Sequence, residues 1–146
     1  ASGYSIAVIV SRWNELVTKE LLAGALDEIE RHGGAAEVIH VPGTWEIPAA
    51  AKALAERPQA KRPSGIVALG CIMQGQTPHA QLLGGDVGSA LMSVQIETGV
   101  PIGWGILTPE TQEQALERAG LKMGNKGREA VVATIEMISV LGQIRK

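Results

Sequence analysis

Four short apolar segments alternate along this chain with longer segments whose apolar residues recur at helical spacing. The predicted strands cover residues 5–10, 38–41, 66–69 and 101–107, and the predicted helices cover residues 16–32, 48–56, 78–98, 110–119 and 126–144. Connections of this length are crossovers rather than hairpins, so the strands should lie parallel with helices on both faces. The sequence therefore predicts one domain over residues 1–146, a three-layer α/β/α sandwich around a four-stranded parallel sheet.

Charge and cysteine content exclude several classes of function. The chain of 146 residues carries 13 Lys and Arg against 15 Asp and Glu, and it has no basic stripe for a nucleic-acid or membrane surface. Cys71 is the only cysteine, which excludes an intrachain disulfide and a metal site of several thiolates. No segment approaches the roughly 20 apolar residues that span a bilayer. We expect a cytoplasmic protein without a metal site, and with neither nucleic acid nor membrane as a partner.

The first candidate for a functional segment follows the third predicted strand, because ligands of parallel sheets collect at the carboxyl ends of the strands. Gln76 and Thr77 precede a helix in which Thr77 is the predicted cap, Pro78 the first residue, and His79 a member of the first turn. The backbone N–H groups of such a helix start bind phosphate, and the helix dipole favours a neutral His79 ring that can accept or donate a proton. The alternative is a capped helix with an exposed histidine.

Two cations near predicted helix ends are further candidates for binding an anion. Arg118 lies late in one helix, and Lys126 begins the last helix in the sequence Gly124-Asn125-Lys126-Gly127. Arginine offers a planar fork that suits phosphate, and lysine offers a mobile point charge. Solvated surface charges are the alternative reading. The segment is not a P-loop, because no glycine directly precedes Lys126 and no Ser or Thr follows it.

Three tryptophans and one tyrosine make up the aromatic residues, since phenylalanine is absent. Trp13 follows the first predicted strand, where its ring could stack on a flat heterocycle, and Trp104 could wall the same ligand. Thr44, Trp45 and Glu46 follow the second predicted strand, where backbone amides and the Glu46 carboxylate could hydrogen-bond a polyol. The alternative is an ordinary helix start with Thr44 as its cap, and tryptophans that serve a core or an interface.

Eight segments, taken in order, resemble the lumazine synthase family. They are Arg12-Trp13-Asn14, Pro42-Gly43-Thr44-Trp45-Glu46-Ile47-Pro48, Ala68-Leu69-Gly70-Cys71, Gly75-Gln76-Thr77-Pro78-His79, Glu97-Thr98-Gly99-Val100-Pro101, Leu107-Thr108, Gln114-Ala115-Leu116-Glu117-Arg118-Ala119-Gly120 and Gly124-Asn125-Lys126-Gly127. Each segment alone is weak, but the ordered set spans nearly the whole chain. The resemblance implies a flavodoxin-like fold and a transferase that condenses a ribityl-substituted diaminopyrimidine with a four-carbon ketone phosphate in riboflavin biosynthesis.

The resemblance also implies roles for individual residues. The pyrimidine and its ribityl chain would be bound by Trp13, Asn14, Thr44, Trp45, Glu46, the backbone of Cys71, Ile72 and Met73, Trp104 and Lys126. The ketone phosphate would be bound by Gln76, Thr77 and Arg118, with Arg118 reaching in from a neighbouring subunit, and His79 would transfer protons. No metal or organic cofactor is implied. Because the substrates bring the amine nucleophile and the phosphate leaving group, the protein supplies orientation, charge neutralisation and proton transfer.

The family's assembly is a further expectation. Its members form pentamers with active sites between subunits, and in many of them pentamers close into an icosahedral shell of sixty subunits. Gly84, Gly85 and Gly88 lie inside a predicted helix, where each glycine costs up to about 1 kcal/mol relative to alanine, so they suggest close helix packing around a fivefold axis. The short connection over residues 120–126 favours the shell. Riboflavin synthase is a candidate for a further partner.

Two other functions remain open at this stage. One is a container or flavin-binding relative that kept the fold and lost catalysis. Trp13 offers a flavin a wider face than the phenylalanine common in the family, but the retention of His79, Arg118, Lys126 and Glu46 together speaks against this alternative. A second departure is Ala80, where the family commonly has phenylalanine or tyrosine. The other function is that of an unrelated phosphate-binding domain of flavodoxin type, which is disfavoured because no Ser/Thr-rich loop follows the first strand.

Overall fold

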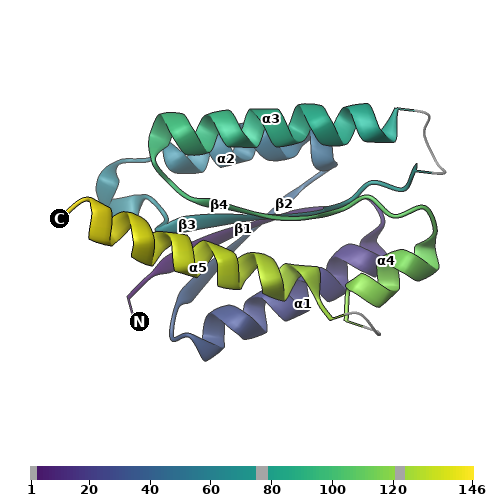
Figure 1. Ribbon diagram of the computed structural model, residues 1–146, viewed down its shortest axis with the longest axis horizontal. Helices are drawn as coiled ribbons and strands as arrows, with labels where there is room; N and C mark the ends of the chain where they lie inside the picture. Colours follow the sequence, from purple (N-terminus) through teal and green to yellow (C-terminus); the bar gives the residue numbers. More distant parts are fainter. Residues whose placement is uncertain (1–2, 75–78, 121–123) are drawn as a thin grey trace.

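Four parallel strands form the centre of the molecule, in the order β2-β1-β3-β4 (Figure 1). This computed structural model describes residues 3–74, 79–120 and 124–146. The strands are β1 (Ser5–Ser11), β2 (Ala35–Val41), β3 (Gly65–Cys71) and β4 (Ile102–Leu107). Val8 of β1 is in register with Val38 of β2 and with Val67 of β3. The predicted parallel sheet is therefore confirmed, and its strand order matches the beginning of the flavodoxin-like order.

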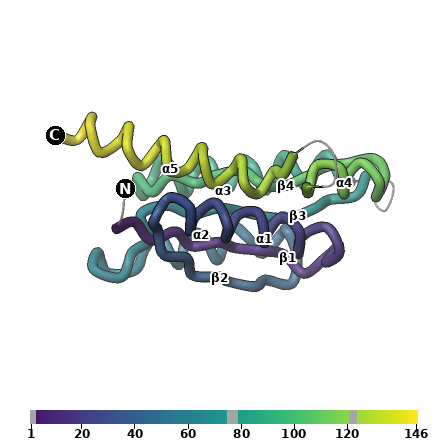
Figure 2. Tube along the Cα trace, turned by 90° about the horizontal axis from the view of Figure 1, so that it is seen from below, coloured from purple at the N-terminus to yellow at the C-terminus, as the bar shows by residue number. Residues whose placement is uncertain are grey.

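Helices cover both faces of the sheet, so the predicted three-layer sandwich is confirmed (Figures 1 and 2). The first face carries α1 (Glu15–Arg31), α4 (Gln112–Arg118) and α5 (Lys126–Ile144), and the second carries α2 (Ile47–Ala55) and α3 (Ala80–Thr98). Alternate strand residues point to opposite faces: Val8 and Leu69 pack under α1 and α5, whereas Ile9 and Ile66 pack under α2 and α3. All of β3 is buried, as its continuous apolar sequence predicts.

Three local details differ from the sequence-based predictions. Strand β2 begins at Ala35, three residues before the predicted start, because its exposed first residues pair with β1 although they lack a strand-like apolar pattern. Thr44 does not cap α2: it is buried and begins a 3-10 turn, η1 (Thr44–Glu46), and Glu46 occupies the cap position. Helix α3 begins at Ala80 with His79 as its cap residue, and the predicted cap Thr77 lies outside the described residues.

Helices α1 and α5 approach each other closely through glycine. A Cβ atom built on Gly127 would collide with the carbonyl oxygen of Leu21, and one built on Gly24 would collide with the side chain of Asn125. Only glycine lets the first turn of α5 lie this close to α1.

A second 3-10 turn, η2 (Gln59–Lys61), precedes β3. Within the ranges that the structure describes, no helix is both long and apolar enough to cross a membrane.

Candidate active site

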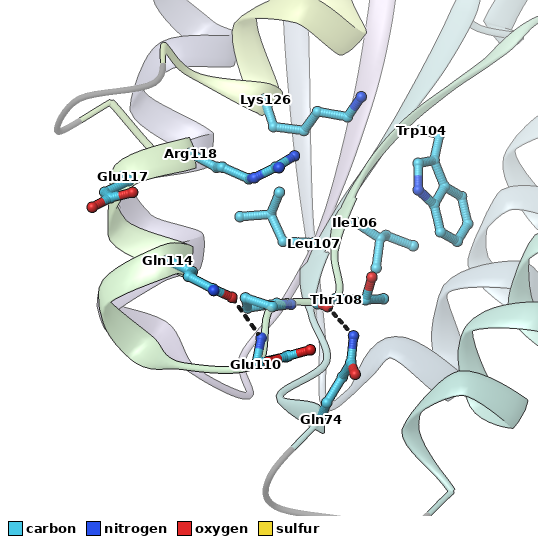
Figure 3. A pocket seen from close by; sticks show the side chains of 11 residues that line it. Gln74, Trp104, Ile106, Leu107, Thr108, Glu110, Gln114, Glu117, Arg118 and Lys126 are labelled. Atoms are coloured by element: carbon cyan, nitrogen blue, oxygen red, sulfur yellow. Dashed lines mark hydrogen bonds between the residues drawn. The ribbon is translucent and has the colours of Figure 1, made fainter.

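A cleft of about 600 Å³ opens beside the carboxyl end of β4, between that strand and the facing ends of α4 and α5 (Figure 3). Its wall combines one tryptophan, two cations, two carboxylates, two side-chain amides and one hydroxyl group. The lining residues are Gln74, Trp104, Ile106, Leu107, Thr108, Pro109, Glu110, Gln114, Glu117, Arg118 and Lys126. The cleft thus lies at the sheet edge where the strand topology predicts a ligand.

Arg118 and Lys126 give one side of this cleft its positive charge. Arg118 is the last residue of α4, and Lys126 is the first residue of α5. Figure 3 shows both side chains extending into the cleft, while Glu117 points away from them. In the described parts of the chain, neither cation forms an ion pair. Because Lys126 also lies at the positive end of a 19-residue helix, the arrangement suits an anion such as phosphate.

Asn125 fixes the relative position of these two cations. Its side-chain oxygen accepts a hydrogen bond of 3.0 Å from the backbone N–H of Arg128, which caps α5. Its Nδ2 donates to the carbonyl oxygen of Ala119, one residue after Arg118, at 3.0 Å and to that of Glu20 in α1 at 2.9 Å. One amide side chain therefore ties the end of α4 and the start of α5 to α1.

Gln74 joins the two strand ends that form the floor of the cleft. Its Nε2 donates to the carbonyl oxygen of Thr108 at 2.6 Å, and its backbone N–H donates to that of Pro109 at 3.0 Å. Ile72 N–H donates to the carbonyl oxygen of Leu107 at 2.8 Å. The sequence analysis did not predict Gln74, Glu110 or Gln114 as site residues. They follow the carboxyl ends of β3 and β4, where a parallel sheet binds its ligands, and this position could have indicated them.

Trp13, Trp45 and Glu46 lie just after the carboxyl ends of β1 and β2, outside the cleft, and we call these three residues the aromatic wall. Trp13 and Trp45 are 68% and 65% exposed, far more than tryptophans that serve a core. A Cβ atom built on Gly43 would lie 2.9 Å from Trp13 Cδ1 and 3.1 Å from Glu46 Oε1. The Trp13 ring and the Glu46 carboxylate therefore flank the Gly43 backbone, an arrangement that suits a flat polar ligand with hydroxyl groups.

Asn14 connects this wall to the end of β3. It has a left-handed backbone conformation with a φ of 61°, and its Nδ2 donates to the carbonyl oxygen of Cys71 at 2.8 Å. Burial raises the pKa of the Cys71 thiol to about 11, and the sulfur lies 3.7 Å from Met73 Sδ. A thiol so buried is not a nucleophile at neutral pH, so the side chain of Cys71 is not a candidate for covalent chemistry.

The structure brings some of the predicted site residues together and keeps others apart. Trp104, Arg118 and Lys126 share the cleft, and Trp104 lies beside Gly88 of α3. Trp13, Thr44, Trp45 and Glu46 do not line it. His79 is exposed at the start of α3, and Gln76 and Thr77 lie outside the described residues. No cluster of potential metal ligands occurs within the described ranges.

Comparison with known proteins identifies the family. The sequence profile of 6,7-dimethyl-8-ribityllumazine synthase matches residues 3–142 of the chain. Proteins named 6,7-dimethyl-8-ribityllumazine synthase from two strains of Thermus thermophilus are each 47% identical to it over 149 aligned positions, which cover 100% of this chain and 93% of each relative. The resemblance carried by the eight ordered segments is therefore confirmed. This chain belongs to the 6,7-dimethyl-8-ribityllumazine synthase family of enzymes.

Proposed function

We propose that this enzyme condenses 5-amino-6-(D-ribitylamino)uracil with 3,4-dihydroxy-2-butanone 4-phosphate to form 6,7-dimethyl-8-ribityllumazine, in the penultimate step of riboflavin biosynthesis. Family membership over residues 3–142 supports the reaction. The observation that carries the assignment of the site is the cleft beside β4, where Arg118 and Lys126 offer two unpaired cations within the described residues. A phosphate leaving group needs such charge close to its oxygens.

The chemistry requires little from the protein beyond position and proton transfer. The pyrimidine amine attacks the ketone and forms an imine with loss of water, phosphate departs, and the second nitrogen closes the ring with loss of a further water. Arg118 and the segment with Gln76 and Thr77 bind the phosphate, Lys126 lies near the polar ligand groups, and His79 moves protons. Because the reaction needs no oxidant or reductant, no redox cofactor takes part in it.

The pyrimidine side of the site is the wall at the ends of β1, β2 and β3. The exposed Trp13 stacks on the pyrimidine ring, and Thr44, Trp45 and Glu46 hold the ribityl chain. In the described part of the chain, the Cys71 carbonyl and the Ile72 N–H already have partners. The Ile72 carbonyl and the Met73 backbone are therefore the groups we assign to the polar edge of the pyrimidine.

The site is proposed to form between two copies of the chain. In one chain the aromatic wall and the cationic cleft do not share a pocket, so the Arg118, Lys126 and Trp104 of one subunit complete the wall of the next. Helix α3 supports this proposal, because Leu82, Met92 and Ile96 are 64%, 56% and 72% exposed on it. The helix glycines that the sequence associates with a fivefold axis, Gly84, Gly85 and Gly88, line a groove on the same helix.

We propose a pentamer as the basic assembly and a shell of sixty subunits as its closed form. Each subunit contacts two neighbours through different surfaces in a ring, which makes every site identical. A second apolar face supports further contacts, because Val132, Met137, Val140 and Ile144 of α5 are 37% to 73% exposed. We place the enzyme in the cytoplasm, and we regard riboflavin synthase as a candidate partner enclosed by the shell.

Absorbance spectroscopy tests the function directly. The native protein, incubated with both substrates, should generate the lumazine chromophore faster than the uncatalysed reaction does. We expect His79→Ala to lower kcat without abolishing turnover, because proton transfer typically contributes about 10²- to 10⁴-fold. Arg118→Ala should raise KM for the ketone phosphate and leave KM for the pyrimidine unchanged. A correctly assembled native protein that gives no acceleration would refute the proposed function.

A flavin-binding role without catalysis is the second candidate, and the large exposed face of Trp13 is the observation that favours it. Titration with riboflavin should quench tryptophan fluorescence if the flavin stacks on this ring. Trp13→Ala is the matched variant, because it removes the stacking face and should abolish the quenching. Quenching without lumazine formation would favour the flavin-binding role over the enzymatic one.

A further inference from the structure

Ser11 carries a buried hydroxyl group to which the described part of the chain offers no hydrogen-bond partner. Ser11 is the last residue of β1, and it is 1% exposed. Among the described residues, Ser11 Oγ is the one buried side-chain oxygen or nitrogen that lacks a hydrogen bond. An unpaired buried hydroxyl destabilises a fold, so such a group calls for a partner that binds at this place.

Gly70, which has no side chain, lies next to this hydroxyl group. A Cβ atom built on Gly70 would lie 3.2 Å from Ser11 Oγ, 3.2 Å from Thr44 Oγ1 and 3.6 Å from Ile106 Cγ1. The two hydroxyl groups therefore face the same space above the Gly70 backbone. Ile106 belongs to the face of the sheet that α2 and α3 cover, so the space lies on this face, and Thr44 begins the turn that carries Trp45 and Glu46.

We propose that Ser11 is a positioning residue for the ribityl chain of the substrate. Its hydroxyl holds that of Thr44 through one water molecule above Gly70, so that the Thr44 hydroxyl keeps a fixed orientation toward the ribityl hydroxyls. A water molecule suits this place because a hydroxyl group both donates and accepts a hydrogen bond. The inference rests on the proposed function, since it assigns Thr44 to the ribityl subsite.

Ser11→Ala tests the inference because it removes the hydroxyl and leaves the shape of the strand unchanged. We expect KM for the ribitylamino-pyrimidine to rise about two- to tenfold, the effect of one net hydrogen bond. KM for the ketone phosphate should not change. The melting temperature should fall only slightly, because the variant loses one water-mediated hydrogen bond and keeps the packing of the strand. A residue with a merely structural role would not separate the two KM values in this way.

Gly70→Ala provides a second route to the same loss. Its methyl group would occupy the shared space, and it should raise KM for the pyrimidine as Ser11→Ala does.

Thr134→Val is the matched control for removing a buried hydroxyl. Thr134 Oγ1 donates to the carbonyl oxygen of Ala130 at 2.7 Å, at the opposite end of the sheet beside Gly103. This variant should lower the melting temperature and leave both KM values unchanged.

A pyrimidine that carries a methyl group in place of the ribityl chain gives the deciding comparison. Native protein and Ser11→Ala should bind this analogue equally, as measured by tryptophan fluorescence, and should differ for the ribityl compound. Equal binding of the ribityl compound by both proteins would overturn the inference. Lumazine formation by the native protein would still support the proposed function in that case. A native protein that neither binds the pyrimidine nor forms lumazine would refute both.

Discussion

Replacing Asn14 separates backbone strain from substrate positioning, because this residue has two distinct tasks. It occupies a left-handed conformation with a φ of 61°, which asparagine and glycine tolerate and alanine does not. Its Nδ2 also donates a hydrogen bond of 2.8 Å to the carbonyl oxygen of Cys71, which orients the backbone at the end of β3. Asn14→Ala and Asn14→Gly both lose this bond, but only the alanine variant adds strain.

The magnitudes follow from these two tasks. Loss of the partly buried hydrogen bond should cost about 1 kcal/mol in both variants. Alanine in the left-handed region should cost a further ~1 kcal/mol. For a chain of this size, each kcal/mol corresponds to roughly 3 °C in melting temperature. Thermal unfolding followed by circular dichroism should therefore place Asn14→Ala about 3 °C below Asn14→Gly, which should itself melt about 3 °C below the native protein.

The kinetic expectation for the same two variants is different. Both should raise KM for the pyrimidine by similar factors, because both lose the amide that holds the Cys71 carbonyl, and KM for the ketone phosphate should not change. Equal melting temperatures for the alanine and glycine variants would refute the argument from backbone strain. An unchanged KM for the pyrimidine in both variants would show that the hydrogen bond does not position this wall.

Three further predictions concern the scaffold of the site. Gly127→Ala should lower the free energy of unfolding, measured with urea, by about 3 kcal/mol or more, because its Cβ atom collides with a backbone carbonyl of α1. Gly142→Ala in the same helix is the control: its Cβ atom meets nothing within 4 Å, so this variant should be neutral or stabilising. The hydrogen bond from Arg128 is the main reason why the pKa of the Asp27 carboxyl lies below 3.8 in the folded protein. Above pH 3.8 the native protein should therefore melt at a higher temperature than Arg128→Met, and this difference should vanish as the pH falls through the lower pKa of the folded state. A difference that does not change with pH would contradict this reasoning. Cys71, whose thiol pKa is about 11, should resist a thiol reagent at pH ~8 in the native protein and react fully after unfolding. Rapid labelling of the native protein would contradict the burial of this thiol.

The order of strands and helices could be predicted from the sequence because it follows from the spacing of the apolar residues. The β-branched runs of β1 and β3 are buried on both faces, and the helices between them are long and regular. The beginning of β2 was missed because an edge strand is held by hydrogen bonds to its neighbour and needs no apolar pattern. The 3-10 turn at Thr44 was missed because the same residues also fit an ordinary helix cap.

The site was predicted only in part. Arg118 and Lys126 were singled out as separate candidates, and the structure explains their proximity by the capping side chain of Asn125, which ties α4 to α5. Gln74 was missed because its hydrogen bond to Thr108 exists only where β3 and β4 are neighbours, and the sequence does not give the order of the strands in the sheet. The separation of the cleft from the aromatic wall within one chain was beyond sequence patterns, because it depends on the places of β1, β2 and β4 in the sheet.

Mixed assemblies test the central claim, that lumazine forms between the aromatic wall of one subunit and the cationic cleft of the next. Trp13→Ala and Arg118→Ala proteins would be unfolded, mixed in equal amounts and reassembled. At a ketone phosphate concentration far below the KM of the Arg118→Ala protein, each variant alone should be nearly inactive. The mixture should recover roughly a quarter of native activity, because in a ring of random composition that share of interfaces carries both intact halves. A mixture no more active than its components, in assemblies shown to contain both chains, would contradict the claim.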